Sequence, residues 1–166
     1  MSTIKIIEYS DAAPGCYAQR ETMAHWLYSE FIYNIRFGIS YEDVLGRFVD
    51  NTDGKLPLRF VAMDGETCVG TISLVKNDHA FREYKPWLAS LFVDRQRRNE
   101  GIGQMLIERV KEAAWALGYD ELYLRTETVG GYYRKLGWLF VEQCVDEFGL
   151  EPEVYRFTKP GAEPLQ

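Results

Sequence analysis

The sequence contains few of the residues that build disulfide frameworks or metal centres. Its 166 residues include three cysteines, Cys16, Cys68 and Cys144, and two histidines, His25 and His79. Three widely spaced cysteines predict neither a disulfide framework nor a zinc knuckle. Two histidines are too few for a multi-histidine metal site. We therefore expect no metal, and we expect His79 to be a solvated loop residue.

The sequence also lacks a long apolar run and an excess of basic residues. No stretch approaches the ~18–20 apolar residues of a membrane span, and the charged N-terminal region offers no signal-peptide core. Nineteen lysines and arginines face 25 aspartates and glutamates, so the formal net charge is −6. This balance argues against general binding to nucleic acid or to anionic membranes. We expect a cytoplasmic protein that binds neither.

Apolar residues are present in the amount that one folded domain needs. The chain is 46% hydrophobic and 27% charged, which is ordinary for a globular protein. Its length corresponds to one domain. Only residues 160–166, with two prolines and a glycine, are expected to form a frayed tail. We therefore predict a single domain over residues 1–159.

Apolar periodicity divides the chain into strand-like and helix-like segments. Strands are predicted over residues 3–9, 58–63, 68–75, 87–93, 121–126, 138–145 and 154–158, and helices from Pro14 to about Asn34, from Ser40, over 101–117 and in a short segment ending at Gly137. Ser40 and Asp43 have the spacing of a capping box. The order of elements predicts a layered α+β (α/β) domain with a mixed sheet. The nearly continuous apolar strand over 87–93 is expected at its centre.

The segment from Leu91 to Leu106 contains the most informative pattern. A buried strand ends there, a basic turn follows, and two glycines open an amphipathic helix. Unpaired N–H groups and the helix dipole attract phosphate to such a helix start. Gly101 and Gly103 let a bulky anion approach the backbone, and Arg97 and Arg98 add positive charge. The pattern predicts a cradle for pyrophosphate.

Two better-known phosphate motifs do not fit this segment. A Walker loop would end in Gly-Lys-Ser/Thr, which is missing, so magnesium nucleotide chemistry is not expected. A dinucleotide-binding fingerprint would need a third glycine, where this chain has Leu106.

Two blocks in this part of the chain resemble the GCN5-related N-acetyltransferase (GNAT) superfamily. The run from Arg98 to Gly103 matches the signature Gln/Arg-x-x-Gly-x-Gly/Ala, and the run from Tyr133 to Trp138 is similar to the block Tyr-x-x-x-Gly-Phe, with Trp in the Phe position. The spacing of the two blocks and the order of strands and helices fit as well.

The resemblance implies a fold and a site for acetyl-CoA. The sheet would have about seven strands, largely antiparallel and flanked by helices, and would open after the fourth strand. The pantetheine arm would pair with the backbone of Leu91, Phe92 and Val93. The cofactor's pyrophosphate would be held by the amides of Gly101, Ile102, Gly103 and Gln104, with Arg98 beside them.

The resemblance also implies an acetyl-CoA-dependent N-acetyltransferase (EC 2.3.1 class) that works by direct attack of an amine in a ternary complex. Tyr133 falls on the usual general acid, and a phenol can donate a proton to the leaving thiolate. The general base is often a carboxylate acting through water. Glu83 is our candidate, with Glu127 and Asp78 as alternatives. Thr126 stands where part of the family carries asparagine.

The acceptor remains open at this point. Aromatic and acidic residues in the segments that form the acceptor site favour a small cationic amine. A protein lysine or an N-terminus is the alternative acceptor. A non-catalytic acyl-CoA-binding sensor is the alternative from another class. The last strands of such folds often take part in a homodimer, which makes one possible here.

Overall fold

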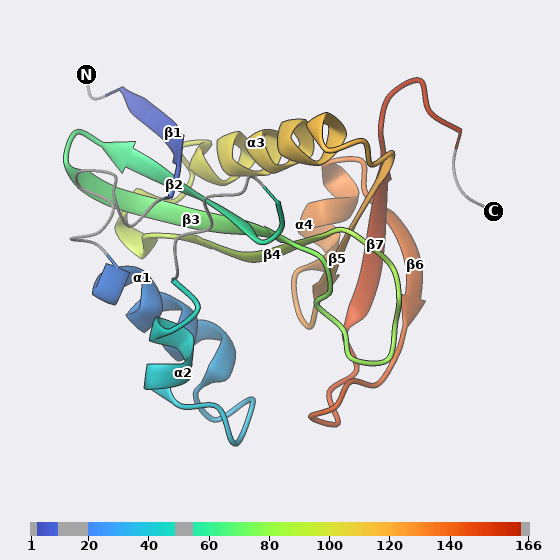
Figure 1. Ribbon diagram of the computed structural model, residues 1–166, viewed down its shortest axis with the longest axis horizontal. Helices are drawn as coiled ribbons and strands as arrows, with labels where there is room; N and C mark the ends of the chain where they lie inside the picture. Colours follow the sequence, from blue (N-terminus) through green and yellow to red (C-terminus); the bar gives the residue numbers. More distant parts are fainter. Residues whose placement is uncertain (1–2, 10–19, 49–54, 164–166) are drawn as a thin grey trace. The chain divides into compact units, whose positions relative to one another are not determined.

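The computed structural model describes residues 3–9, 20–48 and 55–163, which form a seven-stranded mixed sheet with helices against it (Figure 1). The strands are β1 (Ile4–Glu8), β2 (Leu58–Asp64), β3 (Thr67–Val75), β4 (Trp87–Val93), β5 (Glu121–Thr126), β6 (Leu139–Gln143) and β7 (Glu153–Thr158). Their order in the sheet is β1-β2-β3-β4-β5-β7-β6. The predicted α+β class and the central position of β4 are confirmed.

Four α-helices and two short helical turns complete the described chain. These are α1 (Arg20–Leu27), the π-helical turn η2 (Tyr28–Ile32), α2 (Tyr41–Leu45), the 3-10 turn η3 (Arg95–Arg97), α3 (Ile102–Ala116) and α4 (Gly130–Lys135). The predicted start of the first helix at Pro14 lies outside the described residues, as does Cys16. Among the described residues, no helix has the length and apolar character needed to cross a membrane.

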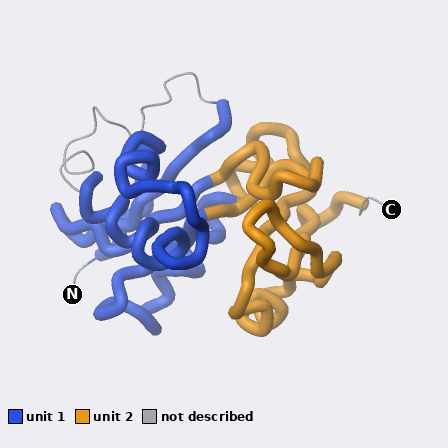
Figure 2. The backbone as a smooth tube through the Cα atoms, turned by 90° about the horizontal axis from the view of Figure 1, so that it is seen from below, with its two compact units in different colours: residues 1–73, 90–110 blue, residues 74–89, 111–166 orange. Residues whose placement is uncertain are grey.

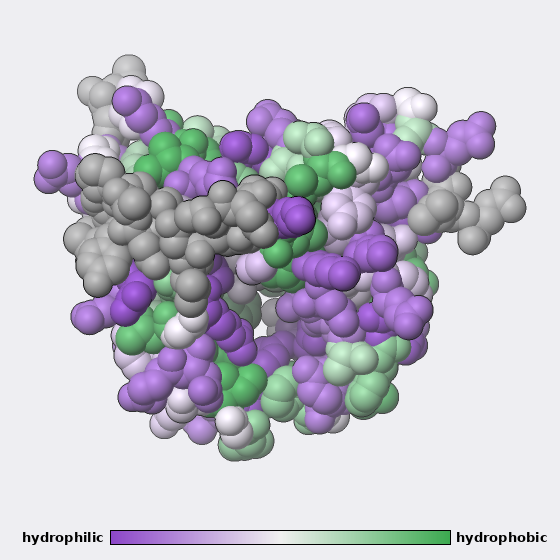
Figure 3. Space-filling model, in the orientation of Figure 1, coloured by the Kyte–Doolittle hydropathy of each residue, from purple (hydrophilic) through white to green (hydrophobic). Residues whose placement is uncertain are grey.

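The chain divides into two compact units (Figure 2). Unit 1 comprises residues 1–73 and 90–110, and unit 2 comprises residues 74–89 and 111–166. The strands β3 and β4 and the helix α3 each contribute residues to both units. The face drawn in Figure 3 is mainly hydrophilic, with smaller apolar patches between the polar side chains.

In unit 1, helices cover both faces of the sheet. Residues of α1, η2 and α2 form one core cluster with strand residues such as Val61, Met63 and Phe92. On the opposite face, a Cβ at Gly70 would lie 3.1 Å from Leu106 of α3. The bare backbone at Gly70 therefore allows α3 to pack closely on the sheet. Arg109, the polar residue in the apolar stripe of α3, lies 4.5 Å from the ring centre of Phe60, a cation–π distance.

Local hydrogen bonds explain where α2 begins and where α1 gives way to the π-helical turn η2. The hydroxyl of Ser40 accepts a hydrogen bond from the Asp43 amide at 3.0 Å, and the Asp43 carboxylate accepts one from the Ser40 amide at 2.8 Å. This confirms the predicted capping box of α2. The first helix does not continue as a regular α-helix. The Tyr33 amide bonds the carbonyl of Tyr28 at 2.8 Å, a five-residue step that marks a π-helical turn.

In unit 2, antiparallel pairs connect β5 with β7 and β7 with β6. The strand β4 pairs with β5 in parallel at Trp87 and Tyr123, and these two residues form a small core with Val154. The helix α3 ends before Gly118, whose φ is +91°. The amide of Tyr119 bonds the carbonyl of Ala114 at 3.1 Å, so a Schellman motif closes the helix where a C′ glycine was predicted.

Candidate active site

The loop between β4 and α3 exposes a row of backbone amides. Asn99 and Gly101 adopt left-handed backbone conformations, with φ of +65° and +82°. The Met105 amide donates to the Gly101 carbonyl at 3.1 Å, within the first turn of α3. The amides of residues 102–104 precede that bond, so they have no acceptor within the helix. The positive end of the helix dipole adds to their attraction for an anion.

The two arginines of this loop differ in their partners. Arg97 lies 2.8 Å from Asp64 and 2.9 Å from Glu100, and these carboxylates offset its charge. The expected contribution of Arg97 to the cradle is therefore corrected: it ties the loop to the end of β2. Arg98 donates from Nε to the Val93 carbonyl at 3.1 Å and has no ion-pair partner among the described residues. Arg98 thus remains available to a phosphate.

The backbone of β4 is irregular next to this loop. Ser90 has a φ of +56°, which is uncommon for a residue other than glycine and interrupts a regular strand. The Asp94 amide bonds the Val69 carbonyl at 2.9 Å, so the polar groups of Asp94 face β3. Because these groups alternate along a strand, Leu91 and Val93 are favoured over Phe92 as backbone contacts for a ligand.

Tyr133 lies on α4 and is 7% exposed. Burial raises the pKa of its phenol well above the ordinary value, with a smaller contribution from Tyr132. The ring packs edge-on against Tyr132 and Trp138, at 5.2 and 6.1 Å between centroids. No hydrogen bond joins its hydroxyl to any of the described residues. The phenol is therefore protonated at neutral pH and has its proton available for donation.

The structure around Tyr133 explains the other residues of the run from Tyr133 to Trp138. The Trp138 amide bonds the Tyr133 carbonyl at 3.1 Å, and Gly137 has a φ of +93°. A glycine is needed there because the helix ends in a left-handed residue. Thr126, at the position where part of the family has asparagine, accepts a hydrogen bond from the Val129 amide at 3.1 Å. Its side chain thus organises the turn that leads into α4.

The three candidate bases have different surroundings. Glu83 is exposed in the segment before β4 and makes no hydrogen bond or ion pair with the residues described. Glu127 lies 3.2 Å from Arg125. Asp78 lies beside the same arginine: its backbone carbonyl accepts a hydrogen bond from Arg125 at 3.2 Å, and against the effect of burial its negative charge raises the pKa of Arg125. Among the three, Glu83 is the carboxylate whose reach is least restricted by a neighbour.

Sequence reasoning missed a further carboxylate, Glu142 on β6. Arg82 donates to both of its oxygens, at 3.1 and 2.7 Å, and the Tyr84 hydroxyl donates to one of them. The hydrogen bonds from Arg82 and then Tyr84 lower the pKa of Glu142 to about 2. These partners are 60 and 58 residues away along the chain, so no local motif indicates them. Glu142 is too weak a base, and too engaged, to accept a proton in catalysis.

His79 is 1% exposed, so the expectation of a solvated histidine is wrong. Its Nε2 lies 3.4 Å from the sulfur of Cys144, and its Nδ1 accepts the Phe81 amide at 3.2 Å. In the neutral ring, Nε2 therefore carries the proton and faces the sulfur. Burial raises the pKa of Cys144 and lowers that of His79. The pair is neutral, unlike the thiolate that covalent catalysis requires.

Known proteins match the chain in sequence and in fold. The sequence profile of the Acetyltransferase (GNAT) family matches residues 20–138. Human N-acetyltransferase 8B is 34% identical over 84 residues, which cover 48% of this chain and 37% of that protein. The matched stretch therefore spans well under half of the relative's length.

Two solved structures illustrate the likeness in fold. A GNAT-family acetyltransferase of Staphylococcus aureus Mu50 has a TM-score of 0.70 at 21% identity, over 94% of this chain and 99% of that one. A candidate acetyltransferase of Salmonella typhimurium, solved with its cofactor acetyl-CoA, has a TM-score of 0.68 at 16% identity, over 99% of both chains. The profile covers well over half of the sequence, and so the chain belongs to the GNAT family of acetyltransferases.

Proposed function

We propose that this protein moves the acetyl group of acetyl-CoA to a primary amine by direct attack in a ternary complex. The observation that carries the proposal is the start of α3, where left-handed Gly101 precedes amides that have no acceptor within the helix. Family membership and a structural relative solved with acetyl-CoA support the choice of ligand.

In this proposal the cradle binds the pyrophosphate of acetyl-CoA. The amides of Gly101, Ile102, Gly103 and Gln104 donate to its oxygens, and Arg98 adds a positive charge at their side. The pantetheine arm pairs with the backbone of β4 at Leu91, Phe92 and Val93, chiefly through the first and last of these. Because backbone groups do most of this binding, truncation of the exposed side chains should weaken it little.

The reaction requires proton transfers at both the amine nitrogen and the thioester sulfur. The amine nitrogen attacks the thioester carbonyl carbon, the carbon–sulfur bond breaks, and its electron pair leaves with the sulfur. Tyr133 donates a hydrogen bond and then its proton to the thiolate, and the raised pKa keeps the phenol protonated until that moment. Glu83, acting through water, takes one proton from the ammonium so that the neutral amine can attack. The nitrogen loses its second proton as the amide forms, and this proton restores the phenol of Tyr133.

The acceptor is proposed to be a small cationic amine, and a protein lysine or an N-terminus is the alternative. A non-catalytic acyl-CoA sensor is less well supported, because it has no use for a buried phenol with its proton free to donate. A homodimer and a cytoplasmic location stay predictions, as do the absence of nucleic-acid and membrane partners and the single domain over residues 1–159 with a frayed tail.

Calorimetric titration of the purified protein with acetyl-CoA tests the proposal. We expect micromolar binding, with weaker binding of dephospho-CoA and ATP. Gly103→Trp should abolish it by placing a bulky ring in the cradle. Gly46→Trp, at an exposed position of ordinary helical backbone, is the matched control and should bind normally. Absence of binding by the wild-type protein would remove the acetyltransferase proposal.

An amine panel, scored by release of free thiol, would then identify the acceptor. The panel should include polyamines, amino sugars, amino acids and a lysine-containing peptide. Turnover of small amines supports the proposed class, whereas turnover of the peptide alone would favour the protein-acetylating alternative. Binding of acetyl-CoA without turnover of any amine would favour the sensor.

A further inference from the structure

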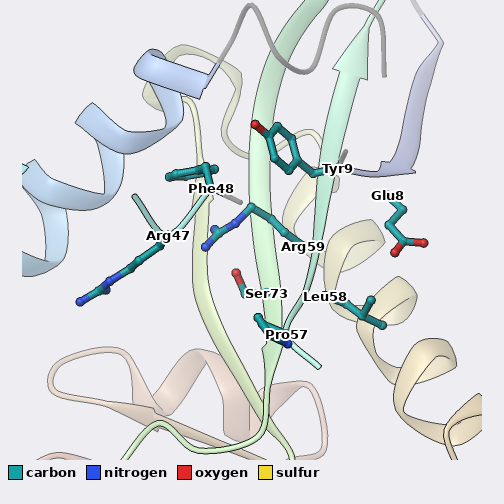
Figure 4. Close-up of a pocket in the computed structure, with 8 residues that line it drawn as sticks. All are labelled: Glu8, Tyr9, Arg47, Phe48, Pro57, Leu58, Arg59 and Ser73. Atoms are coloured by element: carbon teal, nitrogen blue, oxygen red, sulfur yellow. The ribbon is translucent and has the colours of Figure 1, made fainter. Parts of the chain in front are cut away.

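A small hollow, open to solvent, lies within unit 1 beside the ends of β1 and β2 (Figure 4). It plays no part in the cradle described above. The residues that line it are Glu8, Tyr9, Arg47, Phe48, Pro57, Leu58, Arg59 and Ser73. Apolar and aromatic groups make up half of this wall, and two polar side chains from neighbouring strands, Arg59 of β2 and Ser73 of β3, point into it.

Arg59 is a cation without a counter-ion among the described residues. Its guanidinium makes no hydrogen bond or ion pair with the residues that the structure describes, and its Nη1 atom is buried without a partner. The guanidinium carbon lies 4.2 Å from the ring centre of Phe48. Burial, and then the nearby Arg47, lower the pKa of Arg59 to about 10. The group therefore still carries its charge at neutral pH.

Ser73 presents a second unsatisfied group to the same hollow. Its hydroxyl oxygen is buried and has no hydrogen-bond partner in the part of the chain that the structure describes. Figure 4 shows the Arg59 guanidinium between the ring of Phe48 and the Ser73 hydroxyl, whereas the carboxylate of Glu8 points away from it. Native proteins rarely leave a buried polar group unpaired, and an unpaired buried charge is especially costly. Two such groups, each without a partner among the described residues, converge on one hollow and can both donate a hydrogen bond to a ligand there.

We propose that this hollow binds a small monocarboxylate with an apolar body, the carboxylate resting on Arg59 and Ser73. A guanidinium and a hydroxyl donate in the geometry that a carboxylate accepts. The charged side chains of the wall are two arginines and one glutamate, a net charge of +1 that suits a monoanion better than dianionic phosphate. The rings of Tyr9 and Phe48, with Leu58 and Pro57, provide apolar surface for the body of the ligand.

Binding can be tested without any assay of activity. Phenylacetate is the probe, phenylacetamide its neutral counterpart and inorganic phosphate the dianion, each titrated by calorimetry into the full-length protein. We expect phenylacetate to bind at least about tenfold more tightly than either of the others, the order of magnitude of a charge-assisted hydrogen bond. Arg59→Met should remove this preference. Arg95→Met, which changes an exposed arginine outside the hollow, should keep it.

The thermal midpoint of each variant provides a check on folding. Arg59→Met removes a charge that has no partner among the described residues, so its midpoint without ligand should equal or exceed that of the wild type. Saturating phenylacetate should raise the midpoint of the wild type and of Arg95→Met but not that of Arg59→Met. A wild-type protein that binds phenylacetate no better than phenylacetamide would overturn the proposal. So would a folded Arg59→Met protein that binds phenylacetate unchanged.

The carboxylate could belong to the acceptor amine or to a separate metabolite, and the first source rests on the proposed acetyltransferase function. Turnover of phenylalanine and of phenylalaninamide, measured by thiol release, distinguishes the two. If the acceptor carries the carboxylate, phenylalanine is preferred at least about tenfold, and Arg59→Met abolishes that preference. If the ligand is separate, phenylacetate binds while the two amines react alike. Titration with acetyl-CoA on the same sample shows independently whether the acetyltransferase proposal holds.

Discussion

Tyr133 owes its chemistry to burial rather than to a charged partner. We predict that Tyr133→Phe lowers kcat by about 10²- to 10⁴-fold, the usual contribution of a general acid. The Kd for acetyl-CoA should change little, because the phenol acts on a thiolate that forms only during the reaction. Thiol-release kinetics together with calorimetric titration measure both quantities.

Tyr132→Phe is the matched control for that experiment. Tyr132 neighbours Tyr133 on α4 but is 41% exposed, so its loss should leave kcat within a few-fold of the wild-type value. Equal losses of kcat and of acetyl-CoA affinity in Tyr133→Phe would contradict the role of a specific acid. They would indicate a packing role instead.

Glu142 should make the folded state sensitive to acid. Its pKa falls from 4.5 to about 2 in the folded protein, so the unfolded state binds the proton more readily. The ionised Glu142 therefore stabilises the folded state above pH 4.5, and this contribution to the free energy of unfolding is lost as the pH falls toward about 2. Because the ion pair is partly exposed, we expect a loss of about 1 kcal/mol rather than the full value.

Urea unfolding of the wild type and of Glu142→Gln between pH 7 and pH 3 measures this effect. The variant should be less stable than the wild type at pH 7, and the difference should shrink with acidification. Glu66→Gln, the same change at an exposed position in the turn between β2 and β3, serves as a control for a general change of charge. A constant difference across this range would show that the Arg82 ion pair does not hold the pKa of Glu142 down.

At the scale of single residues, the sequence predicts contacts between side chains that lie a few positions apart along the chain. Ser40 and Asp43 are three residues apart, and their capping box could be predicted from spacing alone. The pair of His79 and Cys144 is separated by 65 residues. Arg97 could be placed in the basic turn, but its partner Asp64 lies 33 residues away. Side-chain partners of this kind depend on the register of the sheet, which no local pattern specifies.

Two glycines at helix ends should respond to alanine in opposite directions. Gly118 follows α3 with a φ of +91°, so Gly118→Ala forces a left-handed alanine and should cost about 1 kcal/mol. Gly46 follows α2 with a φ of −65°, and an added Cβ would lie 3.4 Å from the nearest atom, an ordinary contact. Gly46→Ala should therefore stabilise by about 0.4–1 kcal/mol, through the unfolded state.

Thermal unfolding of Gly118→Ala and Gly46→Ala, measured side by side with the wild type, tests both predictions. For a chain of this size, each kcal/mol moves the midpoint by about 2–4 °C, so the two midpoints should lie on either side of the wild-type value. Destabilisation by both alanines would mean that the end of α2 cannot accept a side chain. Stabilisation by both would contradict the Schellman motif of α3.

Elements were predictable where a strong apolar pattern covers the whole element. The ranges of β4 and α3 match their predictions closely, because β4 is almost continuously apolar and apolar residues recur at helical spacing along most of α3. The strand predicted over 138–145 begins one residue later and ends at Gln143. Trp138 is excluded because its amide closes α4 by bonding Tyr133. A composition of strand-forming residues cannot indicate that a neighbouring helix already uses an amide.

For the whole molecule, we predict one cooperative unfolding transition. The two compact units share β3, β4 and α3, so unfolding either unit alone would break a helix and two strands in the middle. Scanning calorimetry should show a single peak whose calorimetric and van't Hoff enthalpies agree. Two separate peaks would contradict the prediction of a single domain.

Fold and family could be predicted at this scale, because two motifs and the order of the elements point to one architecture. The acceptor could not. Side chains such as Arg59 and Ser73 converge on the hollow of unit 1 from separate strands, and their sequence neighbours give no indication of it. A ligand bound by side chains of this kind cannot be predicted from local patterns.

The π-helical turn η2 marks a position where the chain could lose one residue without changing which side chains are buried. Met23 and Leu27 are four residues apart, as one face of an α-helix requires, but the next buried residue, Ile32, comes five residues later. The wide turn absorbs that additional residue and keeps all three side chains in the same core. Removal of one residue between Leu27 and Ile32 would leave an uninterrupted α-helix with the same buried face. An alignment of this chain with relatives that have a regular first helix should therefore open a one-residue gap at this turn.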